Sequence, residues 1–352
     1  YVVNLSLGSN YGPHDGTSDY EQFVSGFIDQ ASTGRAVVVA AGNEREDSSH
    51  AHGTFDVNVN NGTVILEMNV GKKGQGKDDM YVDIWLAGQL IGATLTVVSP
   101  GSVFVGTYGN GQYDEYFHST NAGWVGVTNA GDGPSALTGD REILILIRDS
   151  GAFENPVPGD LRVAEGKWQI YLTAASGSFD AYLGATEGLE ARFVTDISED
   201  GTIGVPATAP QVISVGAYTA RTDWLTLADN YDWAGEVIPP ATPGALASFS
   251  SIGPNRRGDI KPEITAPGQW VMASLSSAAW PDQQGSLSIF WTSREDRRNL
   301  FFTPDSIHAV ARGTSFAAPV VAGICALLLE ADPALSNQGL KDLLTATARV
   351  DS

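Results

Sequence analysis

The sequence predicts an α/β fold, a parallel sheet flanked by helices, interrupted by an inserted antiparallel β-sandwich of jelly-roll-like character. Near both ends of the chain, continuous apolar runs alternate with helical periodicity, which indicates a parallel sheet. The middle shows short alternating runs between Gly, Asn and Asp clusters, which is typical of antiparallel sandwiches. The composition agrees, because the 352 residues include 40 glycines and only 17% are charged, against a usual ~25%.

The first fifty residues predict a strand, a helix and a second strand. Residues 1–7 form an apolar, β-branched run that ends at Gly8, and residues 36–41 form a second one that ends at Gly42-Asn43. Between them lies a helical stripe, with Ser18 as its predicted N-cap and Gly34 as its predicted stop. The stripe consists of Tyr20, Phe23, Val24, Phe27, Ile28 and Ala31.

The segment 51–196 predicts a separate β domain. We therefore divide the chain into a first part of the α/β core at 1–50, the inserted sandwich at 51–196, and a second part of the core at 197–352. The insertion has six predicted strands, at 64–70, 80–86, 95–98, 142–148, 167–172 and 179–183.

The α/β character returns in the last part of the chain. Residues 212–217 predict a strand, and 247–251 lead into a Gly253-Pro254 turn. Residues 319–330 are nearly all apolar and predict a helix that is buried on every side. Asp332-Pro333 ends that helix, and Ser336 is the predicted cap of a final helix that reaches about residue 348.

Charge and cysteine content exclude several classes of function. The net charge of −21 opposes binding to a phosphate backbone, so nucleic acid is not an expected partner. No run approaches the ~18 consecutive apolar residues of a membrane span. The single cysteine, Cys325, excludes an intrachain disulfide and a zinc-finger-type site, and its apolar helix predicts a small core residue.

The run Gly313-Thr314-Ser315-Phe316-Ala317-Ala318-Pro319 places a serine at the start of the apolar helix. Free N–H groups and the positive end of the helix dipole favour negative charge that develops there. A serine before a helix is most often only an N-cap. However, Gly-Thr-Ser-x-Ala-x-Pro resembles the nucleophile motif of the subtilisin-like serine peptidases, the subtilases.

Other stretches resemble the same family in the expected order. Asn4-Leu5-Ser6-Leu7-Gly8 resembles its substrate-binding edge strand, and Ala40-Ala41-Gly42-Asn43 resembles its oxyanion strand. Residues 212–217, 248–251 and 266–268 match segments that precede the nucleophile. The loop Gly12-Pro13-His14-Asp15-Gly16 and the β-rich insertion after Gly-Asn-Glu further resemble the CspA-like branch, which includes clostridial germination proteases. The resemblance and the acidic surface favour a secreted, cell-envelope or spore-associated protein.

The resemblance implies a mechanism for peptide hydrolysis. Ser315 would be the nucleophile of an acyl-enzyme mechanism, and Asn43 together with the Ser315 backbone N–H would hold the oxyanion. The backbone of Ser6, Leu7 and Gly8 would pair with an extended peptide. Ala40, Ala41 and Gly42 would line one side of the S1 pocket. The expected partner is therefore a protein or peptide substrate.

The family's catalytic Asp and His motifs are expected N-terminal to the strand at 1–7, on a separate segment of the same catalytic domain. His52-Gly53-Thr54 imitates the His motif but follows Asn43 and continues into a β pattern, so we interpret His52 as a loop histidine. Surface or loop positions are expected for the other four, His14, His50, His118 and His308. Residues 1–352 alone are therefore expected to be inactive, because a hydroxyl needs an adjacent base.

Two other interpretations remain open. One is a non-catalytic pseudoprotease or binding scaffold that uses the same fold. The other makes the insertion a carbohydrate-binding domain with a platform of Trp85, Trp124 and Trp168, although two of these lie in strand patterns typical of a core. No cofactor and no metal site is expected. Asp78-Asp79 could contribute to a Ca²⁺ site, but the spacing has no EF-hand-like signature.

Overall fold

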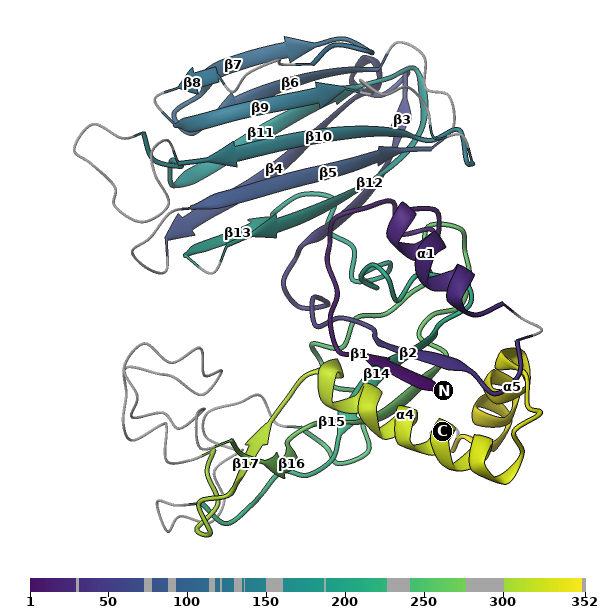
Figure 1. The fold of residues 1–352 in the computed structure, drawn as a ribbon. Coiled ribbons are helices and arrows are strands. Elements are labelled where there is room, and N and C mark those ends of the chain that lie inside the picture. The colour runs from purple at the N-terminus through teal and green to yellow at the C-terminus, as the bar shows by residue number, and fades with distance from the viewer. Residues whose placement is uncertain are drawn as a thin grey trace.

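The computed structural model describes residues 1–349 except 30–31, 73–77, 88–92, 114–117, 121, 130–134, 136, 150–160, 187, 227–240 and 277–300. Two parts lie one above the other in Figure 1, a parallel sheet with helices and a β insertion. Asp78 and Asp79, the residues considered for a Ca²⁺ site, form ion pairs with Lys72 at 2.9 Å and with Arg148 at 2.8 Å.

The core sheet has four parallel strands in the order β1-β2-β14-β15. They are β1 (Val2–Leu5), β2 (Ala36–Ala40), β14 (Ile213–Thr219) and β15 (Ile264–Gln269). The β2 and β14 strands are hydrogen-bonded neighbours although the whole insertion separates them in sequence. The β1 strand pairs only with β2, so its other edge is open within the described residues.

Helices cover both faces of this sheet because successive side chains of β2 point to opposite sides. Val38 and Ala40 pack with α4 (Thr314–Ala331) and α5 (Asn337–Thr347). Val37 and Val39 pack instead with Val24 and Ile28 at α1 (Asp19–Phe27). The hairpin of β16 (Val271–Ser274) and β17 (His308–Ala311) leads directly into α4.

Both predicted helix caps are confirmed. The Ser18 hydroxyl accepts from the Glu21 N–H, and the Glu21 side chain accepts in turn from the Ser18 N–H. The Ser336 hydroxyl accepts from the Gly339 N–H at 3.0 Å. The predicted end of the first helix is wrong. The helix stops at Phe27 because Ile28 is extended, whereas Gly34 lies beyond it in a left-handed turn with φ +67.

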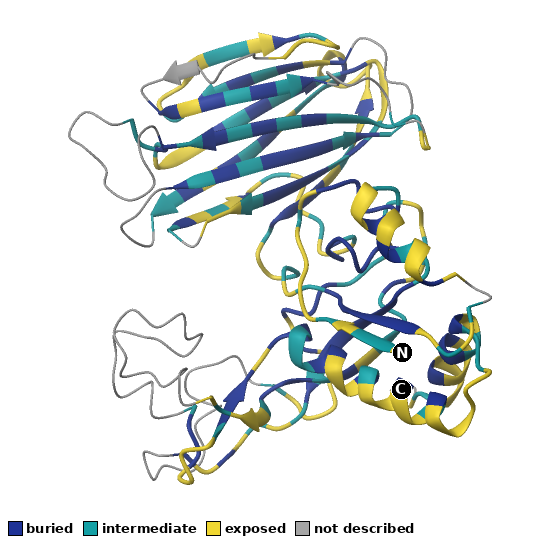
Figure 2. Cartoon of the chain, viewed as in Figure 1, coloured by how far each residue is buried: buried dark blue, intermediate teal, exposed yellow. Residues whose placement is uncertain are grey.

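The prediction that the helix at 319–330 is buried on every side is wrong. One face of α4 packs on the sheet through Ala317, Val321 and Cys325. The outer face is open, with Val320, Ile324 and Leu327 exposed by 37%, 42% and 66% (Figure 2). Within the described residues, α4 is also the one helix whose length and composition would allow a membrane span. The stripe of α1 is likewise only half buried, since Tyr20, Phe23 and Phe27 are exposed.

The insertion contains two antiparallel sheets that share one apolar core. Ile84 and Ile145 of the first sheet and Leu66 and Ile170 of the second belong to the same buried cluster. All six predicted strands are present. The six-stranded sheet has the order β3-β12-β5-β10-β9-β8, and the five-stranded sheet β13-β4-β11-β6-β7. Their bounds are β3 (His50–Asp56), β4 (Thr63–Lys72), β5 (Asp79–Leu86), β6 (Thr94–Ser99), β7 (Val103–Tyr108), β8 (His118–Thr120), β9 (Gly123–Asn129), β10 (Arg141–Arg148), β11 (Gly166–Thr173), β12 (Ser176–Ala185) and β13 (Leu189–Phe193), with a short 3-10 turn at Asn60–Gly62.

The three tryptophans of the proposed sugar platform do not share a surface. Trp168 is fully buried in the core of the insertion, whereas Trp124 is partly exposed on β9. Trp85 lies under the guanidinium of Arg256, at 5.6 Å from the ring centroid. These positions give the carbohydrate interpretation no support.

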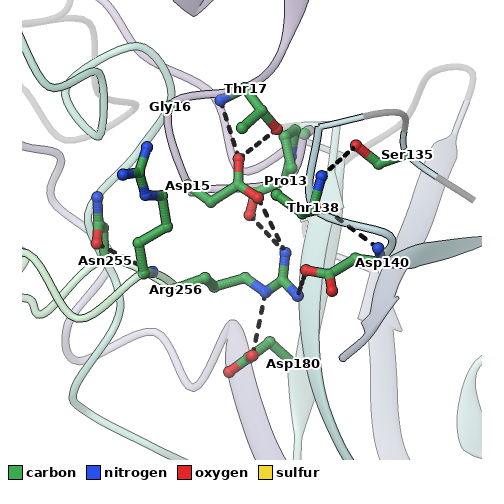
Figure 3. A network of polar contacts seen from close by, with 12 residues as sticks. Pro13, Asp15, Gly16, Thr17, Ser135, Thr138, Asp140, Asp180, Asn255 and Arg256 are labelled. Atoms are coloured by element: carbon green, nitrogen blue, oxygen red, sulfur yellow. Dashed lines mark hydrogen bonds and ion pairs between the residues drawn. The ribbon is translucent and has the colours of Figure 1, made fainter. Parts of the chain in front are cut away.

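Arg256 connects the insertion to the core (Figure 3). Its Nε donates to Asp180 at 3.1 Å and its Nη2 to Asp140 at 2.8 Å, and both carboxylates belong to the insertion. On the core side, its Nη1 donates to the Pro13 carbonyl at 2.9 Å and lies 3.7 Å from Asp15. The side chain is only 5% exposed. A buried cation with hydrogen bonds to both parts fixes them against each other.

The predicted surface or loop placement is wrong for His50, and the predicted loop is wrong for His52, because both lie on β3, whereas His14 does lie in a loop, although a buried one. His14 is completely buried and stacks on Tyr182, with ring centroids 3.6 Å apart. His50 is buried on β3, on the other side of the same tyrosine. His52, predicted to lie in a loop, also lies on β3, and its Nδ1 is 2.9 Å from Asp180. That hydrogen bond raises the pKa of His52. The burial arises because the insertion covers the loop that carries His14.

Burial of His14 predicts loss of stability in acid. Burial lowers the pKa of His14 to about 4, with His50 and Arg256 adding to the effect, although carbonyls of Ile203 and Asn10 face both ring nitrogens. Below the unfolded pKa of about 6.5 the unfolded state binds more protons than the native state. We expect His14 to remove about 2 kcal/mol of stability between pH 7 and pH 5.

The measurement is urea unfolding of the wild type and of His14→Asn at both pH values. Asparagine tolerates the left-handed backbone at this position, φ 50. The variant removes only the contribution of His14, whereas the raised pKa values of His52 and Asp83 affect both proteins alike. An equal pH dependence in the two proteins, or a wild type that gains stability in acid relative to the variant, would contradict the assignment.

Candidate active site

Ser315 is the second residue of α4 and lies beside the open edge of β1. Gly313 precedes the helix with φ +144, a conformation that favours glycine. The Ser315 hydroxyl donates to the Ser6 carbonyl at 3.3 Å, and the Ser6 hydroxyl donates to the Ser315 carbonyl at 2.7 Å. The Ser315 N–H has no acceptor within the described part of the chain. The helix thus presents a hydroxyl and a free amide at the same point.

Asn43 is held against the start of the same helix. Its Oδ1 accepts from the Thr314 N–H at 2.8 Å and lies 3.2 Å from the Thr314 hydroxyl. These contacts identify the oxygen of the amide and leave its Nδ2 as a donor. Among the described residues, no acceptor for this Nδ2 is seen, and Asn43 is exposed. Two donors without a described acceptor, the Asn43 Nδ2 and the Ser315 N–H, are therefore held close together, because Thr314 is bonded to Ser315 and its N–H donates to Asn43.

The turn at Gly42 brings Asn43 into this position. Gly42 has φ +116, and a Cβ there would lie 2.3 Å from Glu44 Oε2 and 2.7 Å from Ser251 Oγ. Its N–H donates to the Thr314 hydroxyl at 3.1 Å, which ties the end of β2 to α4. A side chain at Gly42 would displace Glu44 and Ser251, and the positive φ disfavours other residues, so this turn requires glycine.

Glu44 is a site residue that the sequence analysis missed. Its carboxylate accepts from the Asn43 N–H and from the Ser251 hydroxyl at 3.0 Å, so it supports the backbone of the asparagine. Burial raises the pKa of Glu44. Glu44 could have been identified from the sequence, because an acidic residue directly after Gly-Asn can accept hydrogen bonds from the backbone N–H groups of the turn.

The predicted substrate strand is exposed, whereas part of the predicted S1 wall is buried. Ser6, Leu7 and Gly8 are all exposed beyond the end of β1. The methyl groups of Ala40 and Ala41 pack in the apolar clusters on opposite faces of the sheet. A ligand would therefore meet these two alanines through their backbone, and Gly42, half-buried, is the more accessible of the three.

The described histidine side chains have their hydrogen bonds away from Ser315. His14 faces the carbonyls of Ile203 and Asn10, and His50 and His52 contact Asp180. His308 contacts Asp305 at 2.7 Å. The side chain of His118 lies outside the described residues. No imidazole is thus hydrogen-bonded to the Ser315 hydroxyl in the portion that the structure describes, and that portion contains no group of acidic, His or Cys side chains suited to a metal.

Comparisons with known proteins identify a family to which the chain is similar. Residues 162–352 match the model of the subtilase family. The chain is 32% identical over 143 residues to serine protease AprX of Bacillus subtilis (strain 168), covering 41% of this chain and 26% of AprX. It is 35% identical over 105 residues to subtilisin-like protease SBT1.5 of Arabidopsis thaliana, covering 29% of this chain and 12% of that protein.

A solved structure resembles almost the whole chain. The CspB protease of Clostridium perfringens aligns with a TM-score of 0.68 and 26% identity, over 99% of this chain and 61% of the CspB chain. This similarity agrees with the resemblance to the CspA-like branch. The chain spans about a quarter of the length of AprX and about three fifths of the CspB chain. Since the family model covers more than half of its residues, the chain belongs to the subtilase family.

Proposed function

We propose that this chain carries the nucleophile and the oxyanion hole of a serine endopeptidase. One observation carries the proposal: Ser315 starts a helix beside an exposed edge strand, and Thr314 fixes the Asn43 amide next to it. In the proposed reaction, the Ser315 oxygen attacks the peptide carbonyl. The Asn43 Nδ2 and the Ser315 N–H donate to the oxyanion, and the acyl-enzyme is then hydrolysed.

The proposal assigns the general base to a segment outside residues 1–352. The serine hydroxyl is a weak nucleophile unless an adjacent base accepts its proton. From the order of the motifs in the subtilase family, a His and its orienting Asp would come from an N-terminal segment of the same catalytic domain. Residues 1–352 by themselves would then be inactive.

The backbone of Ser6, Leu7 and Gly8 is the proposed binding edge for the substrate. An extended peptide would add a strand to the open side of β1, and Ala40, Ala41 and Gly42 would line the S1 pocket. Proteins or peptides are therefore the proposed substrates. Family membership and the net charge of −21 support a secreted or cell-envelope location. No cofactor enters the proposed reaction.

The direct test is active-site labelling of the full-length protein expressed from its own gene. A fluorophosphonate should modify Ser315, as mass spectrometry of the labelled peptide would show, and residues 1–352 alone should remain unlabelled. Labelling at another residue would refute the assignment of the nucleophile. Complete absence of labelling in the full-length protein would favour the alternative, a non-catalytic pseudoprotease or binding scaffold.

Asn43→Ala is expected to lower turnover without preventing labelling at long reaction times. Loss of one oxyanion donor costs about 10²–10³ in kcat, because the donor contributes mainly in the transition state. The measurement is kcat and KM on a peptide substrate, with Asn58→Ala, a surface asparagine of the insertion, as the control. A change in KM with unchanged kcat would instead assign Asn43 to ground-state binding.

A further inference from the structure

A cavity of about 800 Å³ lies where the proposed binding edge meets the insertion. The core contributes Gly8, Ser9 and Asn10, which continue the exposed edge segment, and Glu44, Glu46 and Asp47, which follow Asn43 closely in sequence. The opposite wall belongs to the insertion and includes Tyr81 of β5 and Leu183 of β12. The segments that follow Ser6 and Asn43 in sequence therefore both reach the same cavity.

The walls of this cavity are fixed to each other. The Asn10 side chain donates to the Leu183 carbonyl at 3.1 Å, and the Leu183 N–H donates to the Ser49 carbonyl at 2.8 Å. A hydrogen bond joins Tyr81 to Ser9. The insertion thus forms a preformed wall beside the edge strand, as expected of a binding pocket.

The lining carries an excess of negative charge. Five lining residues are acidic and two are basic, so the formal balance is 2 − 5 = −3. The basic Arg148 is already paired with Asp79 at 2.8 Å. Glu46 is exposed, and Glu44, two residues before it, is half-buried. The acidic residues are Glu44, Glu46, Asp47, Asp79 and Glu190, and the basic residues are Arg148 and Arg192.

The distance along the edge indicates which part of a peptide would enter. Ser6 contacts Ser315, and Gly8 and Asn10 follow it by two and four residues. At ~3.3 Å per residue, this is a reach of at most about 13 Å. If Ser6 pairs beside the residue that precedes the scissile bond, Gly8 to Asn10 lie beside the third to the fifth residue before it.

We propose that the cavity is an extended substrate subsite in which the insertion and the acidic residues Glu44, Glu46 and Asp47 select a lysine or arginine three to five residues before the scissile bond. The inference rests on the proposed function, since the proposed roles of Ser315 and Asn43 define the scissile bond and the N-to-C direction in which the peptide runs along the edge. The selectivity then comes from the insertion and its junction, not from the core sheet.

The test uses two peptides that differ only by lysine or norleucine at one of these positions, with the full-length protein. We expect kcat/KM to favour the lysine peptide about tenfold at low salt and less at high salt, because partly exposed charges are screened. The double variant Glu46→Gln/Glu190→Gln should abolish most of this preference. The matched control is Glu330→Gln, which removes an exposed charge at the far end of α4.

Binding to the Ser315→Ala variant, followed by fluorescence anisotropy, separates the subsite from the reaction. Tighter binding of the lysine peptide, if it is lost in the double variant but kept in the control, supports the subsite. If the wild type cleaves neither peptide, the proposed function is refuted, but this binding result still supports the subsite. Cleavage or binding of both peptides to the same extent overturns the subsite and leaves the proposed function intact. A charge preference on the carboxyl side of the scissile bond also overturns it.

Discussion

Replacing Ser315 with alanine in the full-length protein is expected to lower kcat by about 10⁶-fold, the size of effect found for a subtilisin-type nucleophile. The substitution removes the atom that attacks the carbonyl, while the Thr314–Asn43 contact and the Ser315 N–H remain. The residual activity would come from binding and the oxyanion donors alone. The measurement is single-turnover and steady-state hydrolysis of a peptide substrate by the same enzyme preparation.

The control for this prediction is Ser176→Ala, which removes an exposed hydroxyl at the start of β12. It should leave kcat unchanged. Ser315→Ala should unfold at the same urea concentration as the wild type, since the hydroxyl makes one long hydrogen bond of 3.3 Å. A variant that keeps more than a few per cent of the wild-type turnover would show that another group is the nucleophile.

Arg256→Ala is expected to destabilise the protein by about 3–5 kcal/mol, because it leaves carboxylates at a buried junction without their cation. Asp180 and Asp140 are only 17% and 16% exposed, and both depend on this guanidinium. Hydrogen bonds from His50 and His52 and the charge of Arg256 outweigh burial and hold the pKa of Asp180 well below its ordinary value. Asp180 therefore remains ionised in the variant at neutral pH.

Equilibrium urea unfolding measures this loss, and the neighbouring Arg257→Ala provides the control. Arg257 is exposed, and the one hydrogen bond seen for it is a backbone contact with Asn255. Its loss should change stability by less than about 0.5 kcal/mol. Equal effects of the two substitutions would contradict the role assigned to the Arg256 network.

The core sheet and the candidate site could be predicted because their signals are local. Continuous apolar runs predict β1, β2 and β14, and the N-cap residues Ser18 and Ser336 predict the starts of two helices. The β15 strand was not predicted, although residues 266–268 were matched to a family segment, and it contains a proline, which disfavours a strand interior. Proline is tolerated there because β15 has only one partner, β14, among the described strands.

The wrong predictions concern properties that depend on distant partners. Apolar residues at 319–330 indicated burial, but which face of α4 is covered depends on the sheet that meets it. The β7, β8, β9 and β13 strands were not predicted, because glycines interrupt the apolar residues of β7 and β9, and β8 and β13 are only 3 and 5 residues long. The partners of Arg256 lie more than seventy residues away in sequence, so no local pattern could show that this arginine is buried. Ser315 and Asn43 were found only through their motifs.

The insertion leaves the core and returns to it at one point. The His52 N–H donates to the Asp196 carbonyl at 2.9 Å, and the Ser198 N–H donates to the His50 carbonyl at 3.1 Å. In evolutionary terms, neighbouring ends allow a domain to be acquired in one step without stretching its host. Once Arg256 and His14 are buried beneath it, however, its deletion would expose a cation and an imidazole adapted to burial. The domain is therefore easier to gain than to lose.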